Sequence, residues 1–149
     1  YSDADRALMD PSLVASIAES EALDRVALQK APLQRSELYK QVEAIFTSAD
    51  LLVTPSLGAP PPLVSHKAGD PITINGQIAG PLRGNWYNYP APFNLTGHPA
   101  ISIPCGMTPS GLPVGVQVVA PWFEEQGLLD VAAALEALQP WTTDWPPSV

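Results

Sequence analysis

Residues 1–48 carry the pattern of helices, since Ala, Glu, Gln and Leu are frequent there and β-branched residues are few. Asp10 followed by Pro11 predicts a helix start, because aspartate can cap the first turn and proline fits its first position. The pair Ala31-Pro32 predicts that this helix breaks or ends, because proline lacks the amide hydrogen that a helix interior needs.

A second helix is predicted after Ser36, which stands where a helix cap is expected. Its apolar residues recur at helical spacing and form one stripe: Leu38, Val42, Ile45 and Phe46. An apolar stripe of this kind must be buried, so we expect this helix to pack against another element.

Three short apolar runs, 51–54, 100–103 and 114–119, predict strands because they are rich in β-branched residues. The run at 51–54 is continuous, which is typical of a strand covered on both faces. Between the second and third runs, Gly and Pro at 108–113 predict a turn.

From Pro55 to Pro92 the chain is expected to be irregular, apart from a hairpin-like piece at 73–78 in which Asn75-Gly76 predicts the turn. A loop of this length inside a compact domain is usually either functional or disordered, and we favour the functional reading.

The last helix is predicted to begin near Glu124-Glu125, because carboxylates suit a helix N-terminus, and Pro140 is expected to end it. Its apolar stripe consists of Leu128, Ala132 and Leu135. The chain thus divides into a helical section at 1–48, two strands separated by a loop at 49–106, and a strand with a final helix at 107–149. Alternating strands and helices predict an α/β fold with a buried sheet.

Composition describes a globular chain of one-domain length, with 149 residues of which 46% are hydrophobic. The net charge of −8 argues against a nucleic-acid partner, which requires a basic surface. No apolar run reaches the length of a membrane span, so no membrane partner is expected. The single cysteine excludes an internal disulfide framework and favours a reducing compartment, from which we expect a cytoplasmic location.

Cys105 and His98 stand close enough in sequence to suggest a nucleophile and its base. A reactive thiol needs a partly exposed, electropositive niche. Cys105 instead follows an apolar strand, so we expect a buried structural thiol, and we expect His98 to serve the turn in which it stands. His66 lies in the long loop and is expected to be solvated. The two histidines, with no cysteine pair, form no metal-binding pattern.

Five segments, taken in order, closely resemble the C-terminal part of the amidase signature family, serine hydrolases that cleave carboxamides. The first reads D-L-L-V-T-P-S, with Ser56 in place of the family's usual Thr, and the second reads N-L-T-G-H-P-A-I-S-I-P-C-G. The segments are residues 50–56, 94–106, 111–119, 120–125 and 139–142, the last followed by a proline pair at 146–147.

The resemblance implies the C-terminal part of the amidase signature fold, an α/β fold with a mixed sheet covered by helices. It implies hydrolysis of a carboxamide through an acyl-serine intermediate, with no metal or organic cofactor. The family's Ser nucleophile, cis-peptide Ser and Lys base lie upstream, and no catalytic residue maps onto this chain. We therefore expect the chain alone to be inactive, and to need either the missing catalytic segment or association with its own copies.

The resemblance also implies a position for the substrate. Trp86, Tyr87 and Tyr89 precede the second segment, where family members contribute specificity residues, so they are candidate walls of the substrate pocket. Asn94 matches a glycosylation sequon but is expected inside a packed segment, as a turn or capping side chain. In glutaminyl-tRNA amidotransferase A subunits an acidic residue stands where this chain has Tyr87. A general amidase is thus favoured; an amidotransferase subunit and a non-catalytic binding or structural module remain alternatives.

Overall fold

The computed structural model of the chain describes residues 1–141. In chain order, its elements are α1 (Asp3–Ala7), α2 (Pro11–Glu21), α3 (Arg25–Ile45), β1 (Leu52–Pro55), β2 (Pro71–Ile74), β3 (Gln77–Pro81), α4 (Leu82–Asn85), α5 (Ala91–Thr96), β4 (Ala100–Met107), β5 (Pro113–Val119) and α6 (Glu125–Leu138). Proline-rich residues 146–147 and Thr142, which belong to the last family-like segment, lie outside the described residues.

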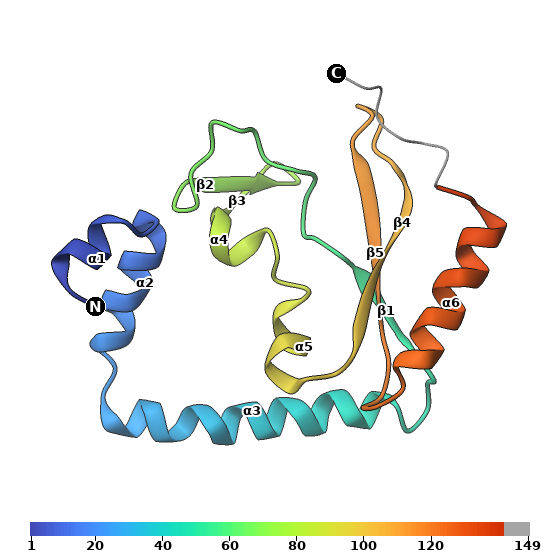
Figure 1. Ribbon diagram of the computed structural model, residues 1–149, viewed down its shortest axis with the longest axis horizontal. Coiled ribbons are helices and arrows are strands. Elements are labelled where there is room, and N and C mark those ends of the chain that lie inside the picture. Colours follow the sequence, from blue (N-terminus) through green and yellow to red (C-terminus); the bar gives the residue numbers. More distant parts are fainter. Residues whose placement is uncertain (142–149) are drawn as a thin grey trace.

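Helix α3 runs the width of the molecule (Figure 1). Helices α1 and α2 stand at its N-terminal end, and the sheet of β1, β5 and β4 stands at the other, with α6 along the far side of that sheet. The β2–β3 hairpin, α4 and α5 occupy the space between. Within residues 1–141, no helix is long and apolar enough to cross a membrane.

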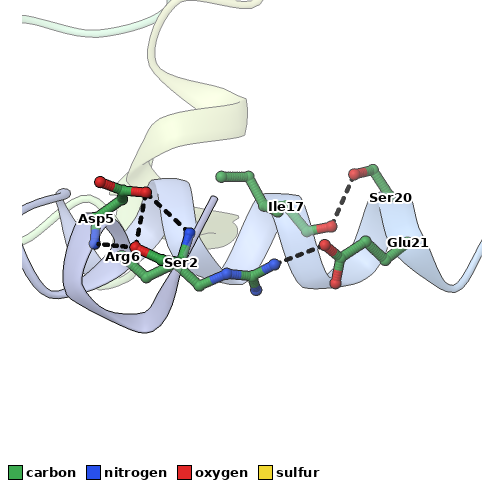
Figure 2. A network of polar contacts seen from close by, with 6 residues as sticks. All are labelled: Ser2, Asp5, Arg6, Ile17, Ser20 and Glu21. Atoms are coloured by element: carbon green, nitrogen blue, oxygen red, sulfur yellow. Dashed lines mark hydrogen bonds and ion pairs between the residues drawn. The ribbon is translucent and has the colours of Figure 1, made fainter.

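The two N-terminal helices are stabilised by local polar contacts (Figure 2). Ser2 and Asp5 form a capping box, in which the Ser2 hydroxyl accepts from the Asp5 amide and the Asp5 carboxylate accepts from the Ser2 amide. Arg6 on α1 forms an ion pair with Glu21 on α2 at 2.7 Å. Asp10 caps α2 by accepting from the Ser12 amide, which confirms the predicted helix start.

Helix α3 is continuous, so the predicted break at Pro32 and the predicted cap at Ser36 are both wrong. Asp24 caps this helix instead, by accepting from the Ala27 amide at 2.7 Å. The Ser36 hydroxyl donates to the Pro32 carbonyl from within the helix. A proline costs a helix one hydrogen bond, and the strong helix formers on both sides outweigh that loss.

The three-stranded sheet has the order β1-β5-β4, and both of its pairings are antiparallel. Its strands cover the three predicted runs, and α6 begins and ends close to the predicted limits. The α/β class is confirmed, with helices and a sheet packed in layers.

Neighbouring residues of β5 point to opposite faces of the sheet and form two cores. Val118 packs with Ile103, Ala120 and Leu128 on the face that α6 covers. Val119 packs on the other face against Val42 of α3 and Phe93 of α5, with Leu38 and Phe46 of the predicted stripe beside them. Ile45, also assigned to that stripe, is largely exposed.

Strand β1 is not covered on both faces, contrary to the sequence prediction. Val53 leaves 61% of its surface exposed, because β1 is an edge strand and α6 packs near β4 at the opposite edge.

The predicted turn at Asn75-Gly76 is confirmed and joins β2 to β3. Both residues have positive φ angles, 51° and 78°, which this type of tight turn requires. The segment from Pro55 to Pro92 is therefore more regular than expected, since it contains this hairpin and α4.

Candidate substrate-binding surface

Trp86 fixes the proline-rich loop that follows β1. Its indole N–H donates to the Ala59 carbonyl at 2.8 Å, and its own carbonyl accepts from the Gly58 amide at 2.7 Å. A Cβ atom at residue 58 would lie 2.9 Å from the Asn85 carbonyl oxygen, so only glycine allows this approach. The loop and the segment after α4 therefore form one unit.

This unit encloses a hollow of about 210 Å³, called here the tryptophan hollow. Its lining is largely apolar and includes Pro60, Pro61, Ile72, Leu82 and Trp86. His66 also reaches the lining, although the residue itself is exposed, as predicted. A lining of this kind suits an apolar group of modest size.

Tyr87 and Tyr89 lie beside the tryptophan hollow and do not line it. The Tyr87 ring meets the Trp86 ring edge-on, with centroids 6.3 Å apart. Tyr87 and Tyr89 are 40% and 39% exposed, so both keep surface free for contact with another group. The Tyr89 carbonyl accepts from the side-chain amide of Gln117 at 3.4 Å, which ties this segment to the sheet.

A second hollow of about 260 Å³, the serine hollow, lies on the other side of the same loop. The two hollows share Ala59, Pro60 and Pro61. The rest of its lining comes from the ends of two strands and the loop: Ser56, Leu57, Gly58, Pro113, Val114 and Gly115. Every residue of this lining is uncharged.

Polar side chains cross the sheet next to the serine hollow. The Ser56 and Ser102 hydroxyls are 2.6 Å apart, and Gln117 donates to the Thr54 hydroxyl at 2.9 Å. The sequence analysis missed this row as a site. Alternating polar residues in apolar strands were its only signal, and the strand register that brings them together is visible only in the structure.

His98 holds the turn before β4 in place. It is 5% exposed, and its two ring nitrogens form hydrogen bonds with the Thr96 hydroxyl at 2.8 Å and with Glu43 of α3 at 2.9 Å. The rings of Tyr39, Phe46 and Trp122 surround it. A hydroxyl, an imidazole and a carboxylate thus stand in sequence, but burial of both Thr96 and His98 keeps a substrate away, and the arrangement is structural.

The same cluster affects Tyr39. Burial, followed by the charge of Glu43 and a hydrogen bond to it, raises the pKa of the Tyr39 phenol.

Comparison with known proteins identifies the family. The sequence profile of the family described as Amidase matches residues 6–129. The chain belongs to the amidase family.

Several amidase-family proteins show the extent of the likeness. AmiA2 of Mycobacterium tuberculosis is 31% identical over 145 residues, which are 95% of this chain and 28% of that protein. The 6-aminohexanoate-cyclic-dimer hydrolase of Paenarthrobacter ureafaciens is 38% identical over 103 residues, 65% of this chain and 20% of its own length. The solved structure of a bacterial aryl acylamidase superposes with a TM-score of 0.78 at 26% identity, covering 93% of this chain and 28% of that one. This chain therefore spans less than a third of each.

Within this amidase chain, two local predictions are wrong. Cys105 is exposed, because it lies in the irregular register between Pro104 and Gly106, where β4 leaves regular pairing with β5. Its only hydrogen-bond contact among the described residues is with the Val114 carbonyl at 3.5 Å, so no histidine activates it. Asn94 is also exposed, on the outer side of α5, and is not packed in the interior.

The described residues contain no activated nucleophile outside the buried Thr96–His98 pair. Ser56 and Ser102 bond only to each other, and no lysine or histidine reaches either hydroxyl. Nor do residues 1–141 contain a group of three or more side chains that could hold a metal ion. The surface around the two hollows can bind and orient a ligand.

Proposed function

We propose that this chain forms the C-terminal portion of an amidase signature hydrolase that cleaves carboxamide C–N bonds through an acyl-serine intermediate. The nucleophile and its base would come from a segment upstream of this chain. The family match over residues 6–129 carries the proposal. The likeness to the acylamidase structure supports it, because it extends over nearly all of this chain.

In this proposal the chain supplies part of the substrate pocket. The tryptophan hollow receives the apolar part of the acyl group, and the exposed faces of Tyr87 and Tyr89 extend that surface. Aryl and extended aliphatic amides are the substrates that such a surface fits best. Water-soluble amides and the single cysteine are compatible with a cytoplasmic enzyme, which we include in the proposal.

An amidotransferase A subunit is the second candidate. The corresponding subunit of Thermodesulfovibrio yellowstonii, named for glutamyl-tRNA(Gln) amidotransferase, is 34% identical over 113 residues, 76% of this chain and 22% of that protein. Tyr87 argues against glutamine as substrate, because a phenol does not neutralise an ammonium group as a carboxylate does. A non-catalytic binding or structural module is the third.

The test measures ammonia release by the complete gene product that contains this chain, with aryl amides, aliphatic amides and glutamine as substrates. We expect turnover of aryl amides, little of glutamine, and none by the 149-residue chain alone. Trp86→Ala should raise KM for aryl amides. Phe123→Ala is the matched control, since that aromatic side chain is exposed and distant in sequence from both hollows. Turnover of glutamine alone would favour the amidotransferase, and no turnover of any amide would favour the non-catalytic module.

A further inference from the structure

The Ser56–Ser102 hydroxyl pair is an unusual feature of this sheet, because it joins the two outer strand regions across the central strand. Ser56 follows β1 and Ser102 lies in β4, while β5 runs between them. Their oxygens nevertheless lie 2.6 Å apart. The contact forms above Gly115 of β5.

Gly115 makes this contact possible. A Cβ atom at residue 115 would lie 2.9 Å from the Ser56 hydroxyl oxygen and 3.0 Å from that of Ser102. Both distances are shorter than ordinary van der Waals contact, so any side chain there would push the hydroxyls apart. The φ angle of Gly115 is not among the positive values, so the glycine is needed for space alone.

The pair has hydrogen-bonding capacity left over. One hydroxyl donates its hydrogen to the other, which leaves a second O–H and several lone pairs unused. Among the described residues, neither hydroxyl has another hydrogen-bond partner. Ser102 is exposed and Ser56 lines the serine hollow, so a ligand can reach them. The pair can therefore donate one hydrogen bond and accept others at the same point.

The uncharged lining of the serine hollow limits what can bind there. A carboxylate or an ammonium group would lose its hydration without a charge partner, which is costly. A carboxamide is neutral, accepts through its oxygen and donates through its nitrogen, so it matches both capacities of the pair.

We propose that the Ser56–Ser102 pair binds a second carboxamide group of the substrate, one that is not cleaved. This inference rests on the proposed amidase function and adds a preference for diamides. The tryptophan hollow would hold the apolar chain between the two amides, since the hollows share the wall formed by Ala59, Pro60 and Pro61.

The test compares substrates that differ only at the end remote from the cleaved bond. For the complete gene product, kcat/KM is measured with linear diamides from malonamide to suberamide and with the monoamides of equal chain length. At the best length, we expect the diamide to exceed its monoamide about 3- to 10-fold, the range of one or two net hydrogen bonds, mostly through KM. Ser102→Ala and Ser56→Ala should abolish that preference and leave monoamide turnover unchanged.

Three further variants separate binding from folding. Ser56→Thr keeps the hydroxyl and should keep the preference. Gly115→Ala keeps both hydroxyls but separates them, and should lose it. Ser65→Ala, at an exposed loop serine, should change nothing. Thermal melting of each variant verifies that it folds.

The outcomes distinguish this inference from the proposed function. If the wild type cleaves no amide, the proposed function fails. If it cleaves monoamides but shows no diamide preference at any length, or if the preference survives Ser102→Ala in a folded variant, the hydroxyl pair does not bind substrate. An equal preference for the matching hydroxyamides would show that the pair reads a hydroxyl and would also overturn the proposal.

Discussion

At the scale of single residues, His98 connects more of the structure than its place in a Gly-His-Pro turn indicates. It joins the end of α5 to α3 through Thr96 and Glu43. We expect His98→Ala to lower the free energy of unfolding by about 1–3 kcal/mol, because it leaves the buried Thr96 hydroxyl without its partner. Urea unfolding measures this. His66→Ala, at an exposed loop residue, is the control and should stay within about 0.5 kcal/mol of wild type. Equal effects of the two substitutions would contradict the structural role of His98.

Tyr39 predicts an alkaline pH dependence. Its pKa is raised in the folded state, so the fold favours the neutral phenol. The stability is fully present below the unfolded-state pKa of about 10 and is lost as pH rises through the higher folded-state pKa. We expect the free energy of unfolding to fall over that interval in wild type and to fall less steeply in Tyr39→Phe. Tyr1→Phe, at an exposed tyrosine, is the control. An unchanged slope in Tyr39→Phe would show that another group is responsible.

At the scale of elements, periodicity predicted the strands and the last helix well, since their apolar residues repeat with the spacing of each structure. It failed where one residue outweighed its neighbours in the prediction. Pro32 was expected to end a helix, but the chain on both sides favours one. Cys105 was expected to be buried, but a bulge, which periodicity does not reveal, places it in solvent.

The candidate site could be predicted only in part. Trp86, Tyr87 and Tyr89 were found from their position before a family-like segment. The Ser56–Ser102 pair was not, because the two residues are 46 positions apart and only the pairing of both strands with β5 brings them together. Gly115 gives no sequence signal either, since its role depends on two hydroxyls from other strands.

The proline inside α3 leads to a prediction for that helix. Replacing Pro32 by Ala restores the amide that would donate to the Leu28 carbonyl, and proline costs a helix interior about 3 kcal/mol relative to alanine. We expect Pro32→Ala to slow amide exchange in the N-terminal half of α3, with a stabilisation of up to that size. Leu33→Ala, at an exposed neighbour, adds no hydrogen bond and is the control. Faster exchange in Pro32→Ala would mean that proline rigidifies this segment.

At the scale of the whole molecule, apolar surface remains uncovered. Val53 on the edge strand β1, Ile78 in the hairpin and Leu138 at the end of α6 are 61%, 78% and 81% exposed. Both outer strands of the three-stranded sheet, β1 and β4, also have an edge that pairs with no described strand. Open strand edges and apolar patches favour association with other chains.

We therefore expect the 149-residue chain, made alone, to self-associate or to depend on a partner despite its net charge of −8. Charge repulsion acts between whole molecules and is screened by salt, whereas an open edge gains hydrogen bonds and apolar contact wherever another strand pairs with it. Raising the salt concentration should thus increase association, and co-expression with the upstream half of a related amidase should raise the soluble yield. Sedimentation velocity measures the first effect and the soluble yield the second. A compact monomer at all salt concentrations, with cooperative melting, would instead show that this chain is an independently stable domain.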